Sequence, residues 1–218
     1  MPEEIDSRRP LKTRTRDWAK SLAGLLVRRR VSPNVISVAS IFFAAIAGAA
    51  FYFASPDDPL QYAQMLVIAA LGIQGRLLCN MLDGMVAVEG GRQTKSGEVF
   101  NDLPDRISDI IILVQAGYTV HTFPLGRELG WIAALLAVLT AYVRMMGGAA
   151  GLKQSFMGPM AKQHRMAVLT AACVLSLFES WKLTSGTLLW VALIVIVLGS
   201  LVTIVRRTIN IVRGLEAR

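Results

Sequence analysis

The sequence predicts an all-α, polytopic membrane protein with six transmembrane helices and an N-terminal amphipathic juxtamembrane helix. Three observations support this fold class. Of 218 residues, 54% are hydrophobic and 17% are charged, which is too apolar for an ordinary soluble domain. Several apolar runs approach or exceed the roughly 20 residues that a helix needs to cross a bilayer. The basic residues are concentrated on alternate connections between these runs, as membrane topology requires.

Six apolar runs predict the membrane spans, at residues 33–54, 62–82, 107–120, 129–146, 166–181 and 188–205. An even number of spans brings both termini to the same side. The chain then divides into three parts, namely a basic segment with the interfacial helix (1–31), a six-helix membrane domain (32–207) and a tail (208–218).

Basic residues mark the cytoplasmic side. Nine Lys and Arg residues precede the first span, whereas the loop after that span carries Asp57 and Asp58 and no base. Because cytoplasmic connections carry the excess of bases, both termini are expected in the cytoplasm of a cell with the chain in its inner membrane. This bias also accounts for the formal net charge of +8 without any nucleic acid as partner, and it suits anionic membrane lipids.

The segment before the first span has an amphipathic pattern. Trp18, Leu22, Leu25 and Leu26 recur at helical spacing beside basic residues, which is typical of a helix lying in the membrane interface. A simple basic anchor is the alternative. Ser32 and the proline that follows it then predict the start of the first span. No cleavable signal is expected, so this span is an uncleaved anchor.

Two cysteines, Cys79 and Cys173, both fall within predicted spans. This position argues against a disulfide framework and favours buried thiols.

Polar residues at helical spacing flank the connection between the second and third spans. Asn80, Asp83, Gly84 and Ala87 lie at i, i+3, i+4 and i+7, so they share one helix face. The third span has a short apolar part, and the polar residues before it, from Gly97 on, also have helical spacing. The ends of the two helices are therefore expected to form a polar cleft at the cytoplasmic surface.

On the second of these helices, Gly97, Asn101 and Asp105 lie at i, i+4 and i+8, with Glu98 close to their face. Carboxylates beside a bilayer are costly to hold, which favours a functional role, and oxygen ligands suit Mg²⁺ or Mn²⁺. Polar contacts between helices and solvated helix ends are the alternative.

The combined pattern resembles the signature of the CDP-alcohol phosphatidyltransferase family, D-x2-D-G-x2-A-R-x8-G-x3-D-x3-D. Every spacing is kept, and the proline and Asn34 at the head of the first span and the six-span layout are also similar. The identities differ at three positions, where Asn80, Val88 and Asn101 stand in place of Asp, Arg and Asp. The two Asn residues together are typical of a bacterial subgroup of the family.

The resemblance implies an enzyme of phospholipid biosynthesis. An acceptor hydroxyl would attack the β-phosphorus of a CDP-activated lipid such as CDP-diacylglycerol, with release of CMP. Asp105 matches the candidate base, and the metal ligands would be Asn80, Asp83, Asn101 and Asp105. Asn34, Gly84, Ala87 and Gly97 would line the place of the CDP-lipid, and the family also suggests a homodimer. The acceptor stays open between glycerol phosphate, inositol phosphate, serine and another lipid.

The two Asn residues change the charge of the site. An Asn carbonyl can coordinate a cation but brings no charge, so the four-position site falls from formally −4 to −2. Two divalent ions would be poorly compensated until the pyrophosphate of the substrate arrived. The expectation is therefore one metal ion, or metal and substrate that bind together.

A second polar cluster precedes the fifth span. Lys162 and Arg165 are expected on a cytoplasmic loop, where they could bind a phosphate of the acceptor or donor. The alternative is the positive charge that cytoplasmic loops carry for topology.

Three functions are compatible with these patterns. The first is an active phosphatidyltransferase. The second is a catalytically weak or inactive CDP-lipid-binding or scaffold protein. The departures from the signature at Asn80, Val88 and Asn101 favour this alternative. The third is a small transporter, which would require internal repeats or broken helices that the sequence does not show.

Overall fold

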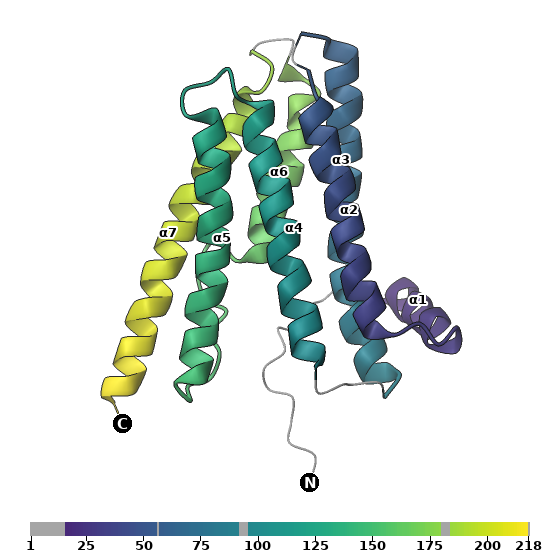
Figure 1. Cartoon of the computed structure of the whole chain (residues 1–218), viewed down its shortest axis with the longest axis vertical. Coiled ribbons are helices and arrows are strands. Elements are labelled where there is room, and N and C mark those ends of the chain that lie inside the picture. Colours follow the sequence, from purple (N-terminus) through teal and green to yellow (C-terminus); the bar gives the residue numbers. More distant parts are fainter. Residues whose placement is uncertain (1–15, 56, 92–95, 180–183, 218) are drawn as a thin grey trace.

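The structure is a computed structural model, and it describes residues 16–55, 57–91, 96–179 and 184–217. Seven helices make up nearly all of these residues (Figure 1). They are α1 (Asp17–Arg28), α2 (Pro33–Phe53), α3 (Pro59–Glu89), α4 (Gly97–Thr119), α5 (Gly126–Ala149), α6 (Lys162–Ser176) and α7 (Thr187–Glu216).

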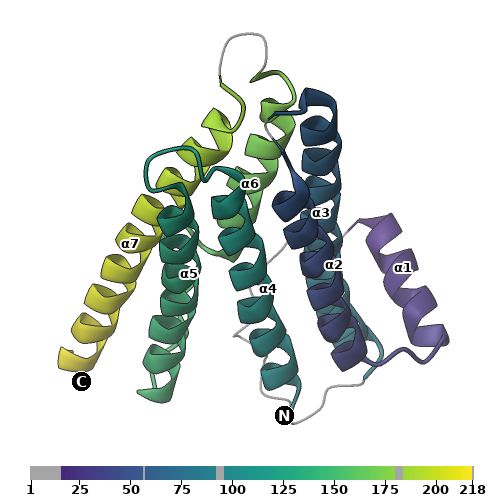
Figure 2. The ribbon, with the colours of Figure 1, turned by 45° about the horizontal axis from the view of Figure 1, so that its top comes forward.

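Six helices form a closed ring. Starting from α2, each helix packs against the next in the order α2, α3, α6, α7, α5 and α4, and α4 returns to α2. Figure 1 shows the helices of this ring running along a common axis, and Figure 2 shows α1 outside it, beside α2 and α3. The last turns of α3 and α7 and the first turn of α4 lie at the same end of the bundle as α1 (Figure 1).

The helices α2, α3, α5 and α7 are long and apolar enough to cross a membrane. Large apolar side chains such as Phe42, Leu135 and Leu198 lie on their outer surfaces, where a soluble protein would carry polar groups. The chain is therefore an integral membrane protein. The expected third and fifth spans correspond to α4 and α6, which do not meet the same length and hydropathy criteria among the described residues.

The observed helices differ from the expected spans mainly at their ends. As expected, α4 begins in the polar stretch, at Gly97, and runs ten residues ahead of the apolar part. In contrast, α6 begins at Lys162 and ends at Ser176, whereas the expected span was 166–181. The first turn of α6 thus includes the polar residues that precede the apolar run. Beyond the last residue of α6, the carboxylate of Glu179 accepts hydrogen bonds from the backbone N–H groups of Gly186 and Leu188, which fixes the chain there.

Close helix contacts depend on small residues. A methyl group at Gly117 of α4 would lie 2.7 Å from the Cα atom of Gly130 of α5, and one at Gly72 of α3 would lie 2.9 Å from Ala47 of α2. Such contacts replace the hydrophobic driving force that is absent between helices in lipid. They set the distances between the helices that carry the polar site.

The start of α2 follows the sequence prediction. The Ser32 hydroxyl accepts a hydrogen bond from the Val35 backbone N–H, and proline occupies the first turn. The predicted helix before it exists as α1, whose Ala19 and Ala23 pack in a hydrophobic cluster with Met85 of α3. Both cysteines are buried free thiols.

Candidate active site

Polar side chains of α3 and α4 form two pairs of contacts, one helical turn apart. The Asn80 amide Nδ2 donates to Asp105 Oδ1 at 2.6 Å. One turn further into the bundle, Arg76 Nη2 lies 2.7 Å from Asp109 Oδ1. Because Arg76 precedes Asn80 by four residues and Asp109 follows Asp105 by four, both pairs lie on one face of each helix. The two halves of the sequence signature are therefore in contact.

A buried ion network surrounds Asp109. Its second oxygen, Oδ2, accepts from Arg165 Nη2 of α6 at 2.8 Å. The other end of the Arg165 guanidinium donates to Thr140 Oγ1 of α5 at 3.2 Å and to the Met160 carbonyl at 2.9 Å. Arg76 and Asp109 are fully buried and Arg165 is 1% exposed. One carboxylate thus ties α3, α4 and α6 together, and Thr140 adds α5.

The carboxylate of Asp105 is surrounded by positive charge. Its Oδ2 contacts the ammonium of Lys162 at the start of α6 and lies 3.6 Å from Arg106 Nη2. Arg76 Nη2 reaches both Asp105 Oδ1, at 3.4 Å, and the Asp105 carbonyl, at 3.1 Å. In the described residues, the carboxylates of Asp105 and Asp109 together contact four cationic side chains.

Asp83 is held by a different set of neighbours. Its Oδ2 accepts from Ser37 Oγ of α2 at 2.6 Å, and its Oδ1 accepts from the Gly84 backbone N–H. The side chain is buried, and it lies within electrostatic range of Asp105 and Lys162. Asp83 therefore belongs to the same polar region, where α2, α3 and α4 converge.

The remaining predicted site residues border this region. Asn34 lies in the first turn of α2, Gly84 and Ala87 lie in the last turns of α3, and Gly97 begins α4, and all four are partly buried. Asn101 is exposed, one turn before Asp105 on α4. The structure thus brings Asn80 to Asp105 but places Asn101 on the surface.

Arg165 differs from the expected phosphate contact. A guanidinium that is 1% exposed and shared between Asp109, Thr140 and the Met160 carbonyl is a fixed part of the bundle. Lys162, in contrast, keeps a side chain that is 23% exposed. Of the two basic residues, Lys162 is therefore the one placed to meet a ligand.

Two carboxylates provide oxygen ligands of the kind that Mg²⁺ and Mn²⁺ prefer. Asp83 and Asp105 come from neighbouring helices and are both buried. No group of three or more His, Cys, Asp or Glu side chains gathers in a metal-binding arrangement in the described ranges. These residues fit one divalent ion whose further ligands come from amides, water or a bound anion.

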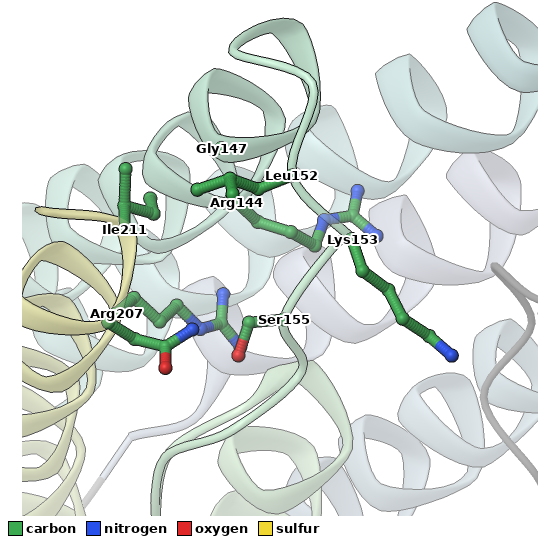
Figure 3. A pocket seen from close by; sticks show the side chains of 8 residues that line it. Arg144, Gly147, Leu152, Lys153, Ser155, Arg207 and Ile211 are labelled. Carbon is green, nitrogen blue, oxygen red and sulfur yellow. The ribbon is translucent and has the colours of Figure 1, made fainter. Parts of the chain in front are cut away.

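A small basic pocket lies beside the polar region (Figure 3). Its lining includes Arg144 of α5, Lys153 and Ser155 of the following connection, and Arg207 of α7. Arg144 Nη2 lies 2.7 Å from Asp102 Oδ1, and Asp102 precedes Asp105 by one turn of α4. The pocket is thus connected to the candidate active site by this ion pair and by Arg207, whose Nη1 donates to the Thr140 carbonyl, since Thr140 Oγ1 accepts from Arg165.

Sequence reasoning missed three residues of this site. Arg76 was a detectable signal because it is a charge inside an otherwise apolar run, four residues before Asn80. Asp109 follows Asp105 by four residues, which was a signal of the same kind. Ser37 gave no signal, since a serine in an apolar helix usually bonds to its own backbone.

Comparison with known proteins provides the context for this geometry. The family model of the CDP-alcohol phosphatidyltransferases matches residues 30–211. Among curated proteins, an archaetidylinositol phosphate synthase of Aeropyrum pernix is 28% identical over 74% of this chain and 76% of its own. The inner membrane protein YnbA of Escherichia coli is 22% identical over 76% of this chain and 78% of its own.

Solved structures of a phosphatidylinositol phosphate synthase of Mycobacterium tuberculosis share the fold. One, in complex with manganese and citrate, has a TM-score of 0.70 and 23% identity and covers 88% of both chains. Another, with CDP-DAG bound, has a TM-score of 0.69 and 22% identity and covers 88% of this chain and 92% of its own.

Proposed function

The chain belongs to the CDP-alcohol phosphatidyltransferase family, and we propose that it transfers a phosphatidyl-type group from a CDP-activated lipid such as CDP-diacylglycerol to an acceptor hydroxyl. The contact between Asn80 and Asp105 is the observation that carries the proposal, because it joins the two halves of the family signature. A likeness in fold to a structure with CDP-DAG bound supports the choice of donor.

In the proposed reaction, the acceptor oxygen forms a new bond to the β-phosphorus of the CDP-lipid. Its proton passes to the Asp105 carboxylate, and the bond from that phosphorus to the phosphate oxygen of CMP breaks. Asp83, Asn80 and Asn101 with Asp105 are the proposed ligands of a divalent ion, Mg²⁺ or Mn²⁺, as the family uses. When bound, this ion supplies positive charge to the pyrophosphate and the leaving CMP.

The other proposed contacts follow from position. Gly84, Ala87 and Gly97 border the polar region where α3 ends and α4 begins, and Asn34 lies near it at the start of α2. Small residues on this face leave room for a nucleotide to lie against the helix backbone. Lys162 is the proposed contact for a phosphate of the donor.

We propose that the acceptor alcohol itself carries a phosphate. The basic pocket supports this choice through the exposed Lys153 and the partly exposed Arg144, because clustered Arg and Lys suit phosphate oxygens (Figure 3). Arg207, which is 4% exposed and donates to the Met157 and Thr140 carbonyls, is a fixed part of the pocket wall. The names of the synthases of A. pernix and M. tuberculosis also describe products with a phosphorylated inositol.

The test is CMP release by the purified protein in detergent, with CDP-diacylglycerol, Mn²⁺ and a panel of acceptors. We expect CMP release with inositol phosphate or glycerol phosphate and much less with inositol, glycerol or serine. CMP release with none of a broad panel would contradict the enzyme proposal. Equal CMP release with the unphosphorylated alcohols would contradict the proposal that the acceptor carries a phosphate, but not the proposal that the protein is an enzyme.

A catalytically inactive CDP-lipid-binding protein is the second candidate. It is favoured by Asn80, Val88 and Asn101 in the signature and by the cations around Asp105. Saturable binding of CDP-diacylglycerol without CMP release from any acceptor would identify it.

The proposed layout has six spans, with both termini and the active site in the cytoplasm. It rests on the asymmetry of Lys and Arg and on the position of the end of α3 and the start of α4 at the same end of the bundle as α1. In a chain whose Cys79 and Cys173 are replaced by Ala, Asp57→Cys is expected to react with an impermeant thiol reagent in intact cells. Glu98→Cys is expected to react only after the membrane is opened, and the reverse pattern would overturn the layout.

The homodimer that the family suggests is a further part of the proposal. The mass of the purified protein in detergent, corrected for bound detergent, checks it. A monomer mass at all protein concentrations tested would contradict it.

A further inference from the structure

The charge balance around Asp105 is opposite to that of an ordinary divalent-cation site. Four cationic side chains contact the carboxylates of Asp105 and Asp109, and these are Arg76, Arg106, Lys162 and Arg165. When the nearby carboxylate of Asp83 is added, and Asp102 with its second partner Arg144, the cations still outnumber the acids by one. Since like charges repel strongly in a weakly screened interior, this cluster disfavours an added cation and favours an added anion.

The hydrogen bonds of Asp105 point to the same conclusion. Its Oδ1 accepts from the Asn80 amide and Arg76, and its Oδ2 contacts the Lys162 ammonium. Both oxygens are therefore taken by N–H donors. A cation that used Asp105 as a ligand would compete most directly with the ammonium of Lys162, because Oδ1 already accepts from two donors.

Lys162 is the group that can leave. Arg76 is fully buried and also holds Asp109. The Lys162 side chain is 23% exposed, begins α6, and ends in a compact charge on a flexible stem. Because Arg76 is buried and Lys162 is partly exposed, Lys162 is the cation of this network that an incoming diphosphate can reach.

We propose that Lys162 provides at Asp105 the positive charge that a second divalent ion would otherwise bring, and that it transfers from Asp105 to the diphosphate when the CDP-lipid binds. This inference rests on the proposed function. Before substrate binds, the Lys162–Asp105 pair keeps the site poor in metal. Once the diphosphate draws Lys162 away, Asp105 is free to bind one divalent ion and to receive the acceptor proton.

The proposal requires coupling between metal and lipid. The CDP-lipid strengthens metal binding because it removes the competing ammonium from Asp105, and by linkage the metal strengthens lipid binding by the same factor. Without Lys162, the empty protein gains metal affinity and the lipid loses a cationic contact. These two changes have opposite directions, which a general loss of folding cannot produce.

The experiment measures Mn²⁺ binding by electron paramagnetic resonance on metal-stripped protein in detergent, with and without CDP-diacylglycerol. The proteins are the parent, Lys162→Met, Lys162→Arg and the control Lys20→Met, which removes an exposed charge of α1. CDP-diacylglycerol binding in EDTA is measured for the same set. In the parent we expect weak Mn²⁺ binding that the lipid strengthens at least about fivefold, to one equivalent.

We expect Lys162→Met to bind Mn²⁺ at least about fivefold more tightly than the parent when lipid is absent, and to bind CDP-diacylglycerol in EDTA at least about fivefold more weakly. Lys162→Arg and Lys20→Met should resemble the parent. Equal Mn²⁺ affinity in Lys162→Met and parent would overturn the inference. So would tight binding of two Mn²⁺ by the parent without lipid, a measurement that needs no variant to fold.

The same data separate this inference from the proposed function. A parent that binds CDP-diacylglycerol and releases CMP, but whose Mn²⁺ binding is unaffected by Lys162→Met, contradicts the role of Lys162 alone. A parent that neither binds CDP-diacylglycerol nor releases CMP in the presence of Mn²⁺ contradicts the function, and the inference with it.

Discussion

Two parts of α4 are held in the bundle by different kinds of contact. In its middle turns, Asp105 and Asp109 form ion pairs with side chains of α3 and α6. Near its end, Gly117 lets α4 approach Gly130 of α5 so closely that a methyl group would lie 2.7 Å from the Cα atom of that residue. The glycine contact is the usual way to pack helices in lipid. A buried ion network adds little stability over apolar packing, so its presence around Asp105 and Asp109 indicates a functional site there.

The largest effect is expected at Asp105. Asp105→Asn removes the proposed base but keeps a side chain of the same shape, so CMP release should fall about 10²- to 10⁴-fold. Binding of CDP-diacylglycerol in EDTA should remain. The matched control is Asp57→Asn, on an exposed turn outside the ion network. Equal rates of CMP release in Asp105→Asn and the parent would contradict the assignment of Asp105 as the base and the functional role of the ion network.

Asp109 is expected to matter for stability more than for chemistry. Asp109→Asn removes the carboxylate that pairs with the buried Arg165 and leaves Arg76 with the longer, 3.4 Å contact to Asp105, which costs about 3–5 kcal/mol of the free energy of unfolding. Asp102→Asn breaks the partly exposed pair with Arg144 and should cost less than about 1 kcal/mol. Unfolding of both variants in detergent is the measurement. Similar losses would mean that burial of the network contributes nothing.

The glycine contact at the far end of α4 should give a smaller loss. Gly117→Ala places a methyl group against the backbone of α5, and such overpacking costs about 1–3 kcal/mol. In Gly24→Ala of α1, the added methyl group meets nothing within 4 Å, and we expect equal or higher stability there. The folded fraction of Gly117→Ala should keep its Mn²⁺ binding. Loss of Mn²⁺ binding without loss of stability would show that the Gly117 contact and the metal site around Asp105 are coupled.

The smallest effect is expected at Glu98. This carboxylate lies near the polar face in sequence but is exposed in the first turn of α4. Glu98→Gln should therefore change neither CMP release nor Mn²⁺ affinity, and its stability should stay within about 0.5 kcal/mol of the parent. Weaker Mn²⁺ binding in this variant would show that Glu98 replaces one of the two acids missing from the signature.

The spacing of the signature correctly predicted that polar residues of α3 and α4 come together. Residues four apart must share a helix face, and Asn80 and Asp105 do meet. The capped start of α2 and the amphipathic α1 followed from equally local rules. Such features depend on a few neighbouring residues, which the sequence displays directly.

The partners of the charged residues could not be predicted in the same way. Which carboxylate receives Lys162 or Arg165 depends on how α6 packs against α3, and hydrophobic periodicity contains no information about that packing. Nor did it locate the end of α6, because Leu177 and Phe178 continue the apolar run beyond the last helical residue. The exposure of Asn101 also depends on the rotation of α4 about its axis.

The sharing of Asp109 between two arginines also has a consequence for synthesis. Arg76 precedes Asp109 in the chain, so the two can pair as soon as α4 has emerged. Arg165 follows Asp109 by 56 residues, which at about 5–20 residues per second takes the ribosome roughly 3 to 11 seconds. During that interval Arg76 is the arginine available to hold α4 against α3. The ion network is therefore completed only after α6 has been made, because α6 brings both Lys162 and Arg165 to Asp105 and Asp109.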